Sequence, residues 1–220
     1  MLVAERHQKI LELVNRNGSI RVTELSKICN VTEETIRRDL SILEKQGKLM
    51  RSHGGAVSVE GQRETPFFER EIMNVEEKKA IAKRAIEFIS PGEKIILDAS
   101  TTAWYMAGMI PDIPLTVITN SIRVVQKLSN KEHIEVISTG GVLTSRSMSF
   151  IGPMAEKHLK MYHANKVFIS CKGVDLENMS ESNVLQAAVK QRMIESGDEV
   201  YLLVDYSKIS EKTLTVLAPL

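Results

Sequence analysis

Residues 32–57 read TEETIRRDLSILEKQGKLMRSHGGAV, and this stretch decides the fold of the N-terminal part of the chain. Thr32 and the two glutamates after it are typical of a helix N-terminus. Three apolar residues then recur at helical spacing, namely Ile36, Leu40 and Leu43. The stretch therefore predicts an amphipathic helix that buries these residues and turns its arginines to another face. After Gly47, an apolar-basic alternation broken by Gly54-Gly55 predicts a small β-hairpin.

Two more helices are expected before this stretch. Residues 5–16 place apolar side chains at helical spacing and end at Asn17-Gly18, which tolerates a left-handed turn. A short helix capped by Thr23 follows, and Asn30-Val31 forms the turn to the third helix. A tight turn followed by a basic helix is the geometry that places side chains in the major groove of DNA. Residues 1–57 are therefore predicted to form a winged helix-turn-helix, with the hairpin as the wing.

Charge gives weak support for DNA binding at this end. The 220-residue chain has a formal net charge of only +1, but residues 1–57 hold ten Lys and Arg against seven Asp and Glu. The adjacent Arg37 and Arg38 could equally belong to a solvated helix face paired with Asp39 and Glu44. The basic residues of the wing favour the DNA interpretation, and they are Lys48, Arg51 and His53.

The rest of the chain has a different pattern. Residues 58–74 show no regular periodicity, contain Pro66 and many charges, and are interpreted as a linker. From residue 75 to 220, helical segments alternate with short β-branched runs, which are KIILD, LTVIT, IEVIS, KVFIS and EVYLLVD, with LTVLA as a last short strand. This alternation predicts an α/β domain with a mainly parallel sheet and helices on both faces.

Polar or glycine-rich turns follow three of these strands, at the edge where ligands bind in such sheets. The residues concerned are Asp98, Ser100, Thr101, Thr102, Asn120, Gly140 and Gly141. Free N–H groups and hydroxyls at a helix start suit an anion such as phosphate, although Ser and Thr are also ordinary helix caps. Because the polar turns recur after successive strands, the sequence predicts an anion site there.

The stretch 32–57 resembles the N-terminal signature of the DeoR (deoxyribose-operon repressor) family of sugar-metabolism regulators. The resemblance continues through PFFEREIMNVEEKKAIAKRA, DASTT, TNS, Gly140-Gly141 and DYSK, and so covers nearly the whole chain. It implies that Thr35, Arg37 and Arg38 meet bases or phosphates in the major groove. It also implies that Thr32, Arg51 and His53 touch the DNA backbone.

The same resemblance implies an effector domain similar in fold to ribose-phosphate isomerase. It groups Glu181, Lys190, Asp205 and Lys208 at the effector site, with Lys172 as a further candidate, although from spacing alone either Lys172 or Lys190 could be a surface lysine. Two features depart from the family pattern. Asn178 stands where glycine is more common, and family members usually continue beyond the equivalent of Leu220, so the chain is expected to be shortened or its last sheet incomplete.

The resulting expectation is a DNA-binding repressor of a sugar operon, modulated by a phosphorylated sugar and assembled as a homodimer or homotetramer. It is expected to have no catalytic residue, cofactor or metal. A sugar-phosphate isomerase is the alternative, because a carboxylate and a lysine near a phosphate loop could transfer protons. An architectural DNA-binding protein is a third possibility, but it leaves residues 75–220 unexplained.

Localisation and thiol state can also be predicted from the sequence. No apolar run reaches membrane-spanning length and the N-terminus is charged, which predicts a cytoplasmic protein without membrane association. Cys29 and Cys171 are far apart in the sequence and each lies beside apolar residues. They are therefore predicted to be buried, reduced thiols.

Overall fold

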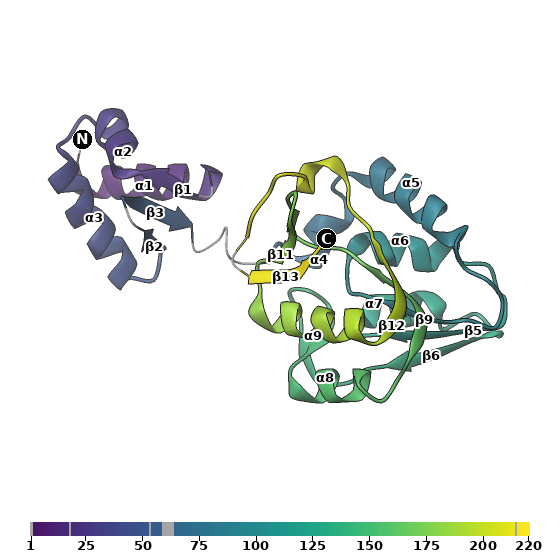
Figure 1. The fold of residues 1–220 in the computed structure, drawn as a ribbon. Coiled ribbons are helices and arrows are strands. Elements are labelled where there is room, and N and C mark those ends of the chain that lie inside the picture. The colour runs from purple at the N-terminus through teal and green to yellow at the C-terminus, as the bar shows by residue number, and fades with distance from the viewer. Residues whose placement is uncertain (1, 18, 53, 59–63, 214) are drawn as a thin grey trace. The chain divides into compact units, whose positions relative to one another are not determined.

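The structure is a computed structural model that describes residues 2–17, 19–52, 54–58, 64–213 and 215–220 (Figure 1). Its contacts divide the chain between Glu64 and Thr65 into two units. Each unit has its own hydrophobic core, and each is described separately below.

The N-terminal unit consists of three helices and a three-stranded antiparallel sheet with strand order β1-β3-β2. Its elements are α1 (Val3–Asn17), β1 (Ser19–Arg21), α2 (Val22–Cys29), α3 (Glu33–Lys45), β2 (Leu49–Ser52) and β3 (Gly55–Ser58). Apolar residues from all three helices fill the core, among them Ile10, Leu25, Ile36, Leu40 and Leu43. The predicted winged helix-turn-helix is confirmed, with β2 and β3 as its wing.

Two details of this unit differ from the sequence-based prediction. The pattern does not predict β1, because three residues are too few to show an alternation. Helix α2 begins at Val22 after Arg21, so Thr23 lies inside the helix and does not cap it. Strands β1 and β3 lie so close that a Cβ atom on Gly55 would be 2.3 Å from the carbonyl oxygen of Ile20, and this position therefore requires glycine.

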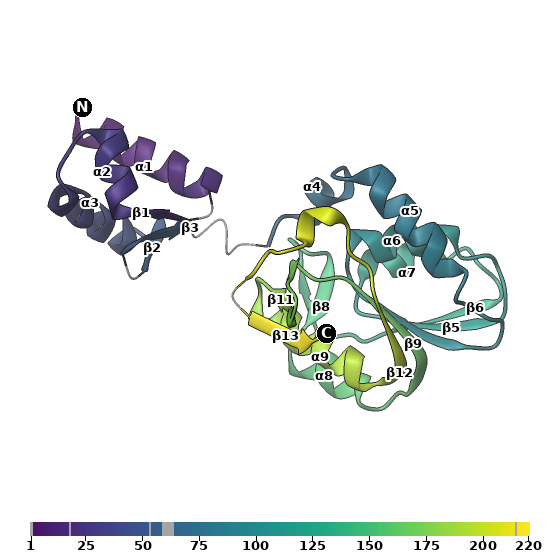
Figure 2. The same ribbon diagram turned by 45° about the horizontal axis from the view of Figure 1, so that its top comes forward.

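The second unit is built on a five-stranded parallel sheet with the order β12-β9-β4-β5-β6. Its strands are β4 (Lys94–Leu97), β5 (Leu115–Thr119), β6 (Ile134–Ser138), β9 (Ala164–Ile169) and β12 (Gly197–Leu202). Helices α5 (Val75–Ile86), α6 (Thr101–Met109) and α7 (Ile122–Leu128) cover one face, while α8 (Pro153–Leu159) and α9 (Val184–Glu195) cover the other (Figure 2). The parallel α/β architecture is therefore confirmed.

Alternation along the strands explains why both faces of the sheet are covered. Ile95 and Leu97 belong to the core cluster shared with α5, α6 and α7. Ile96, between them, belongs to the opposite cluster shared with α8 and α9. Side chains of successive strand residues point to opposite faces, so a β-branched run with few polar residues must be buried on both.

Several short elements lie outside the predicted pattern. They are α4 (Phe67–Glu71), the antiparallel hairpin of β7 (Val142–Thr144) and β8 (Ser149–Ile151), the strands β10 (Gly173–Val174) and β11 (Asn178–Glu181), and the 3-10 helix η1 (Tyr206–Lys208). The predicted last strand exists as β13 (Thr215–Pro219), but it pairs with β11 in a separate antiparallel sheet. Helix α4 falls in the segment interpreted as a linker, and its five residues are too short to show helical periodicity.

The cysteine prediction is confirmed, since Cys29 and Cys171 are both buried and free. Burial raises the pKa of each thiol, which keeps it protonated and unreactive. Within the described ranges, no helix is long and apolar enough to cross a membrane. The same ranges contain no group of three or more His, Cys, Asp or Glu residues that could hold a metal ion.

Candidate functional site

The N-terminus of α3 presents two threonines. Thr32 caps the helix, because its hydroxyl accepts a hydrogen bond from the backbone N–H of Thr35 at 3.3 Å. The two hydroxyls lie 2.9 Å apart, which holds both at the first turn of the helix. A helix N-terminus favours negative charge, so this end of α3 suits contact with a phosphate group.

The two adjacent arginines of α3 have different surroundings. Arg37 is exposed and donates to Glu33 at 2.8 Å, one turn earlier on the helix. Arg38 is also exposed, but its side chain makes no hydrogen bond or ion pair with the described residues. Exposed pairs of this kind stabilise a helix by only about 0.3–0.5 kcal/mol, so Arg37 is lightly held and Arg38 is unrestrained.

The wing is tied to α3 through Arg51. Its backbone N–H donates to the Glu44 carboxylate at 2.9 Å, and its guanidinium donates to the hydroxyl of Ser41 at 2.7 Å. These contacts hold the guanidinium of Arg51 beside the exposed face of α3. His53, predicted to contact the DNA backbone, lies outside the residues that the structure describes.

Asp39 is directed into the core of the unit, contrary to its interpretation as a partner of the exposed arginines. It accepts hydrogen bonds from Arg6 at 2.6 and 3.1 Å and lies 2.9 Å from the imidazole of His7. Burial alone would raise the pKa of Asp39, but the bonds from Arg6 and His7 outweigh it and lower the pKa. The signal available in the sequence was the position of Asp39 three residues after the buried Ile36, on the apolar face of the helix.

In the second unit, Asp98 organises the turn between β4 and α6. It is fully buried, and its two oxygens accept from the backbone N–H groups of Ser100 and Ser170, each at 3.0 Å. Ser100 in turn caps α6 by accepting from the N–H of Ala103 at 3.1 Å. The hydroxyls of the next two residues, Thr101 and Thr102, have no hydrogen-bond partner among the described residues.

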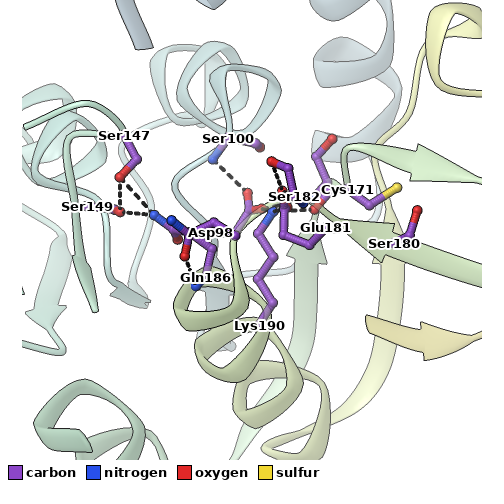
Figure 3. Close-up of polar contacts among 12 residues, drawn as sticks. Asp98, Ser100, Ser147, Ser149, Cys171, Ser180, Glu181, Ser182, Gln186 and Lys190 are labelled. Carbon is purple, nitrogen blue, oxygen red and sulfur yellow. Dashed lines mark hydrogen bonds and ion pairs between the residues drawn. The ribbon is translucent and has the colours of Figure 1, made fainter. Parts of the chain in front are cut away.

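Lys190 on α9 is the centre of a buried charge cluster (Figure 3). Its ammonium donates to the carbonyl of Ser170 and to the carboxylate of Glu181, both at 2.7 Å, and lies 3.4 Å from Asp98. Burial alone would lower the pKa of Lys190, but the two carboxylates outweigh it and raise the pKa. Burial likewise tends to raise the pKa of Glu181, and the charge of Lys190 reverses this. The structure thus brings these three residues together.

Lys208 approaches the same group of residues from η1. Its ammonium donates to the hydroxyl of Ser170 and to the carbonyl of Cys171, both at 2.8 Å. Burial lowers the pKa of Lys208, and the nearby charge of Lys190 lowers it further. No carboxylate pairs with Lys208 in the described part of the chain, so an anion bound nearby would stabilise its positive charge.

Asn120 carries a buried acceptor without a partner. Its side-chain N–H donates to the carbonyl of Phe150 at 3.1 Å, which fixes the orientation of the amide. The amide oxygen is buried and accepts no hydrogen bond within the described residues. An unpaired buried acceptor costs about 1–3 kcal/mol, so this oxygen favours any ligand that brings a donor.

Three other predicted effector residues make no hydrogen bond or ion pair with Lys190 in the described part of the chain, although the charge of Asp205 acts on Lys208. Asp205 accepts from Asn74 at 3.3 Å and caps η1, so it faces the start of α5. Lys172 is exposed, and its side chain has no partner in the described ranges. Gly141 has a φ of +113°, and a Cβ there would lie 2.8 Å from a carbonyl oxygen of β8. Backbone conformation and packing therefore explain the glycine at this position without a bound ligand.

Sequence reasoning missed Ser170, although a signal for it was present. Ser170 ends the run KVFIS, and it lies at the carboxyl end of β9, the neighbour of β4. The rule that singled out Ser100 and Asn120, a polar residue after a buried strand, applies to it equally. In the structure Ser170 contacts Asp98, Lys190 and Lys208, and so connects the whole site.

Comparison with known proteins gives matches to both units. Residues 6–62 match the DeoR-like helix-turn-helix domain, and residues 73–220 match the DeoR C terminal sensor domain. Over 222 residues the chain is 60% identical to an uncharacterised HTH-type transcriptional regulator of Bacillus subtilis, covering 100% of this chain and 86% of that protein. Over 217 residues it is 42% identical to the L-fucose operon activator of Haemophilus influenzae, covering 98% of this chain and 87% of that protein.

Among solved structures, the chain is similar to ribose 5-phosphate isomerase A of Methanocaldococcus jannaschii. The similarity covers 62% of this chain and 55% of that one, with 16% sequence identity and a TM-score of 0.46. Nothing about activity follows from similarity at this level.

Proposed function

Because the chain belongs to the DeoR family of transcriptional regulators, we propose that α3 and the wing bind operator DNA and that a phosphorylated sugar, bound at the strand ends of the sensor unit, changes the affinity for that DNA. The chain is a regulator and not a sugar-phosphate isomerase, since both of its units match regulator domains. The observation that carries the effector proposal is the pair of hydroxyls of Thr101 and Thr102 at the N-terminus of α6, neither of which has a hydrogen-bond partner among the described residues.

The phosphate is assigned to the start of α6. The first N–H groups of a helix and its dipole favour an anion, and the two hydroxyls add donors. Lys208 is connected to this turn through Ser170 and Asp98 and has no carboxylate partner among the described residues. A phosphate dianion only accepts hydrogen bonds, so this set of donors supports its binding.

The sugar end of the ligand is assigned to Asn120. Its buried amide oxygen accepts no hydrogen bond within the described residues, and a phosphate has no proton to offer it. A sugar hydroxyl can donate to this oxygen and so relieve the cost of an unpaired buried acceptor. The donor set at α6 and the acceptor at Asn120 together support a ligand with both a phosphate and hydroxyl groups.

The direction of regulation is a separate matter from effector binding. The sequence leads us to expect a repressor, whereas one relative is named as an activator. We propose only that the effector shifts operator affinity, by a typical coupling of about 1–3 kcal/mol, or roughly 5- to 150-fold. Linkage then requires that operator DNA change the effector's affinity by the same factor.

The experiment begins by selecting an operator sequence from random DNA duplexes with the purified protein. Operator affinity is then measured with and without ribose 5-phosphate, glucose 6-phosphate, fructose 6-phosphate and fructose 1-phosphate, and with the corresponding free sugars. At least one phosphate ester should shift the affinity while its free sugar does not. If free sugars act equally well, the proposal of a phosphorylated effector is wrong. If the protein selects no DNA sequence, the proposal of operator binding is wrong.

Arg38→Ala is expected to weaken operator binding by about 1–3 kcal/mol and to relax the preference at one base pair, because an unrestrained guanidinium can make a bidentate base contact. Arg51→Ala should instead weaken all sequences alike and flatten the salt dependence of binding, as expected for a phosphate contact. Titrations on the selected operator and on single-base variants measure both effects. Full-strength operator binding by both variants would exclude α3 and the wing as the DNA surface.

Thr101→Val and Thr101→Asp are expected to abolish the effector response and to leave ligand-free operator binding unchanged. The first removes a hydroxyl donor, and the second places a negative charge against the phosphate. Thr116→Val, on a neighbouring strand of the same sheet, is the matched control and should respond normally. A normal response in both Thr101 variants would contradict the assignment of the phosphate to the start of α6.

The protein is expected to be at least a homodimer. A single winged helix reads few base pairs, and two modules related by a two-fold axis double the contact on a palindromic operator. Sedimentation at micromolar concentration, with and without operator DNA, tests this expectation. A monomer under both conditions would count against it.

A further inference from the structure

The tip of the β7–β8 hairpin holds the first turns of two helices. The carbonyl of Arg146 accepts from the N–H of Phe67 at 2.7 Å, and the carbonyl of Met148 accepts from the N–H of Ile122 at 3.1 Å. Phe67 and Ile122 are the first residues of α4 and α7. Helix α4 is also the first helix after the boundary between the two units, so the hairpin tip fixes the point where the chain enters the sensor unit.

The same hairpin tip is bonded to α9 through the side chain of Gln186. Gln186 donates from its amide nitrogen to the hydroxyls of Ser147 at 2.8 Å and Ser149 at 2.6 Å. The two hydroxyls are themselves 2.8 Å apart, and all three residues are at most 2% exposed (Figure 3). Because buried polar groups depend on each other for hydrogen bonding, this cluster has few alternative arrangements.

Gln186 lies one helical turn before Lys190 on α9, so the two side chains share a face of the helix. Lys190 is held by Glu181 and the carbonyl of Ser170 and lies near Asp98, which organises the turn where the phosphate is assigned. A shift of Lys190 caused by the effector would move α9 as a rigid element. It would therefore also move Gln186 against the hairpin tip.

We propose that Gln186, with Ser147 and Ser149, is a positioning residue that transmits occupancy of the effector site to the start of α4, and through it to the DNA-binding unit. The proposal rests on the proposed function, since it concerns how the same site regulates DNA binding. The side-chain hydrogen bonds of Gln186 with described residues go to the two serines and not to the residues assigned to the phosphate. Its role is to couple movement of α9 to movement of the hairpin tip, residues 145–149.

The far end of α4 is held independently, which makes the role of the hairpin testable. Lys78 donates to the carbonyls of Arg70 and Met73, the latter at 2.6 Å. These bonds and the buried ring of Phe67 do not depend on Gln186, so loss of the Gln186 bonds leaves α4 attached to the unit. A variant at Gln186 should keep the fold of the sensor unit and lose only its response.

The test compares Gln186→Met with Gln191→Met. Methionine has a similar length to glutamine but donates no hydrogen bond, and the two serine hydroxyls can still pair with each other. Gln191 is the matched control, because it lies on the same helix and donates to the carbonyl of Leu217 on β13 and not to the β7–β8 hairpin. For each protein, operator affinity is measured with and without the four sugar phosphates named above, and their affinity for the DNA-free protein is measured by calorimetry.

Gln186→Met is expected to reduce the effector-induced change in operator affinity by about 2- to 30-fold, with ligand-free operator affinity and effector affinity close to wild type. Gln191→Met should respond like wild type. A normal response in Gln186→Met, or equal losses in both variants, would overturn the proposal. The proposal would also be overturned if Gln186→Met lowered stability but left unchanged the ratio of operator affinities with and without effector. That result would indicate a purely structural role.

Two provisions keep the outcome decisive. If Gln186→Met does not fold, the double variant Ser147→Ala with Ser149→Ala removes the acceptors in its place, and the same readout applies. If wild type itself responds to none of the four sugar phosphates, the proposed effector class fails. If wild type responds and Gln186→Met responds equally, only the transmission through Gln186 fails.

Discussion

Replacing Lys190 with methionine is expected to lower the free energy of unfolding of the sensor unit by about 3–5 kcal/mol. The ammonium is buried against Glu181 at 2.7 Å and lies 3.4 Å from Asp98. Without it, two buried carboxylates lose the ammonium that contacts them, and the more distant charge of Lys208 compensates only in part. Such a loss is far more costly than that of a surface ion pair. Trp104 is the single tryptophan of the chain and lies on α6, so its fluorescence during urea unfolding reports on this unit.

Two controls separate a charge effect from a packing effect. Arg192→Met removes a partly exposed pair with Glu195 on the same helix, and should cost at most about 1 kcal/mol. Adding Glu181→Gln to Lys190→Met removes one of the stranded charges and should recover part of the lost stability. If the double variant is no more stable than the single one, the cost is due to packing and the charge interpretation is wrong.

The loss caused by Lys190→Met should also depend on pH. In the folded wild type the charge of Lys190 outweighs burial and lowers the pKa of Glu181 below the ordinary value of 4.5. A carboxyl with a lowered pKa stabilises the fold above its ordinary pKa and loses this contribution as the pH falls through the folded value. The difference in stability between wild type and variant should therefore be largest near neutral pH and should narrow as the pH falls below the ordinary pKa of 4.5.

Asp39→Asn is expected to destabilise the N-terminal unit by about 3–5 kcal/mol, because it leaves the buried guanidinium of Arg6 without a counter-charge. Hydrogen exchange of the backbone amides in α3 is the suitable measurement, since the unit contains no tryptophan or tyrosine. The protection factors of these amides should fall by the amount that corresponds to the lost free energy of unfolding. Glu33→Gln, which breaks only the exposed pair with Arg37, should change protection by less than about 0.5 kcal/mol.

The Asp39 network also predicts an acid dependence. The bonds from Arg6 and His7 outweigh burial and lower the pKa of Asp39 from 3.8. Its contribution is therefore complete above pH 3.8 and disappears as the pH falls through the folded pKa. Asp39→Asn should lack this part of the acid unfolding of the N-terminal unit. An unchanged acid transition in the variant would show that Asp39 is not its source.

The sequence predicts the parts of this structure that depend on local periodicity. The buried face of α3, the alternation of helices and strands, and the polar turn at Asp98 and Ser100 can all be recognised within a few residues of each other. The proximity of Glu181 to Lys190 was implied only by the family resemblance. Their nine-residue separation in the sequence does not show that a strand and a helix bring the two side chains together. DNA and effector contacts assigned to individual residues remain predictions.

Contacts between distant residues could not be predicted. Asp39 meets Arg6 across 33 residues, and Asp205 meets Asn74 across 131 residues. Both carboxylates have nearer basic residues in the sequence that look like equally good partners. The helix α4 escaped prediction for a related reason, since its ends are held by Arg146 and Lys78 and its own sequence gives too few positions to show a pattern.

A helix of five residues has almost no stability of its own, because the nucleating turn costs more than its few hydrogen bonds return. Helix α4 is therefore stabilised by its contacts with the rest of the sensor unit, namely the buried ring of Phe67 and the bonds at its two ends. If these contacts were lost together, the segment could unwind and lengthen the connection between the two units. Extended chain rises by about 3.3 Å per residue against 1.5 Å in a helix, so unwinding would lengthen that connection by roughly 9 Å. In the proposed dimer, two DNA-binding units on longer connections would sample a larger volume, and the effective concentration of the second unit at a two-site operator would fall.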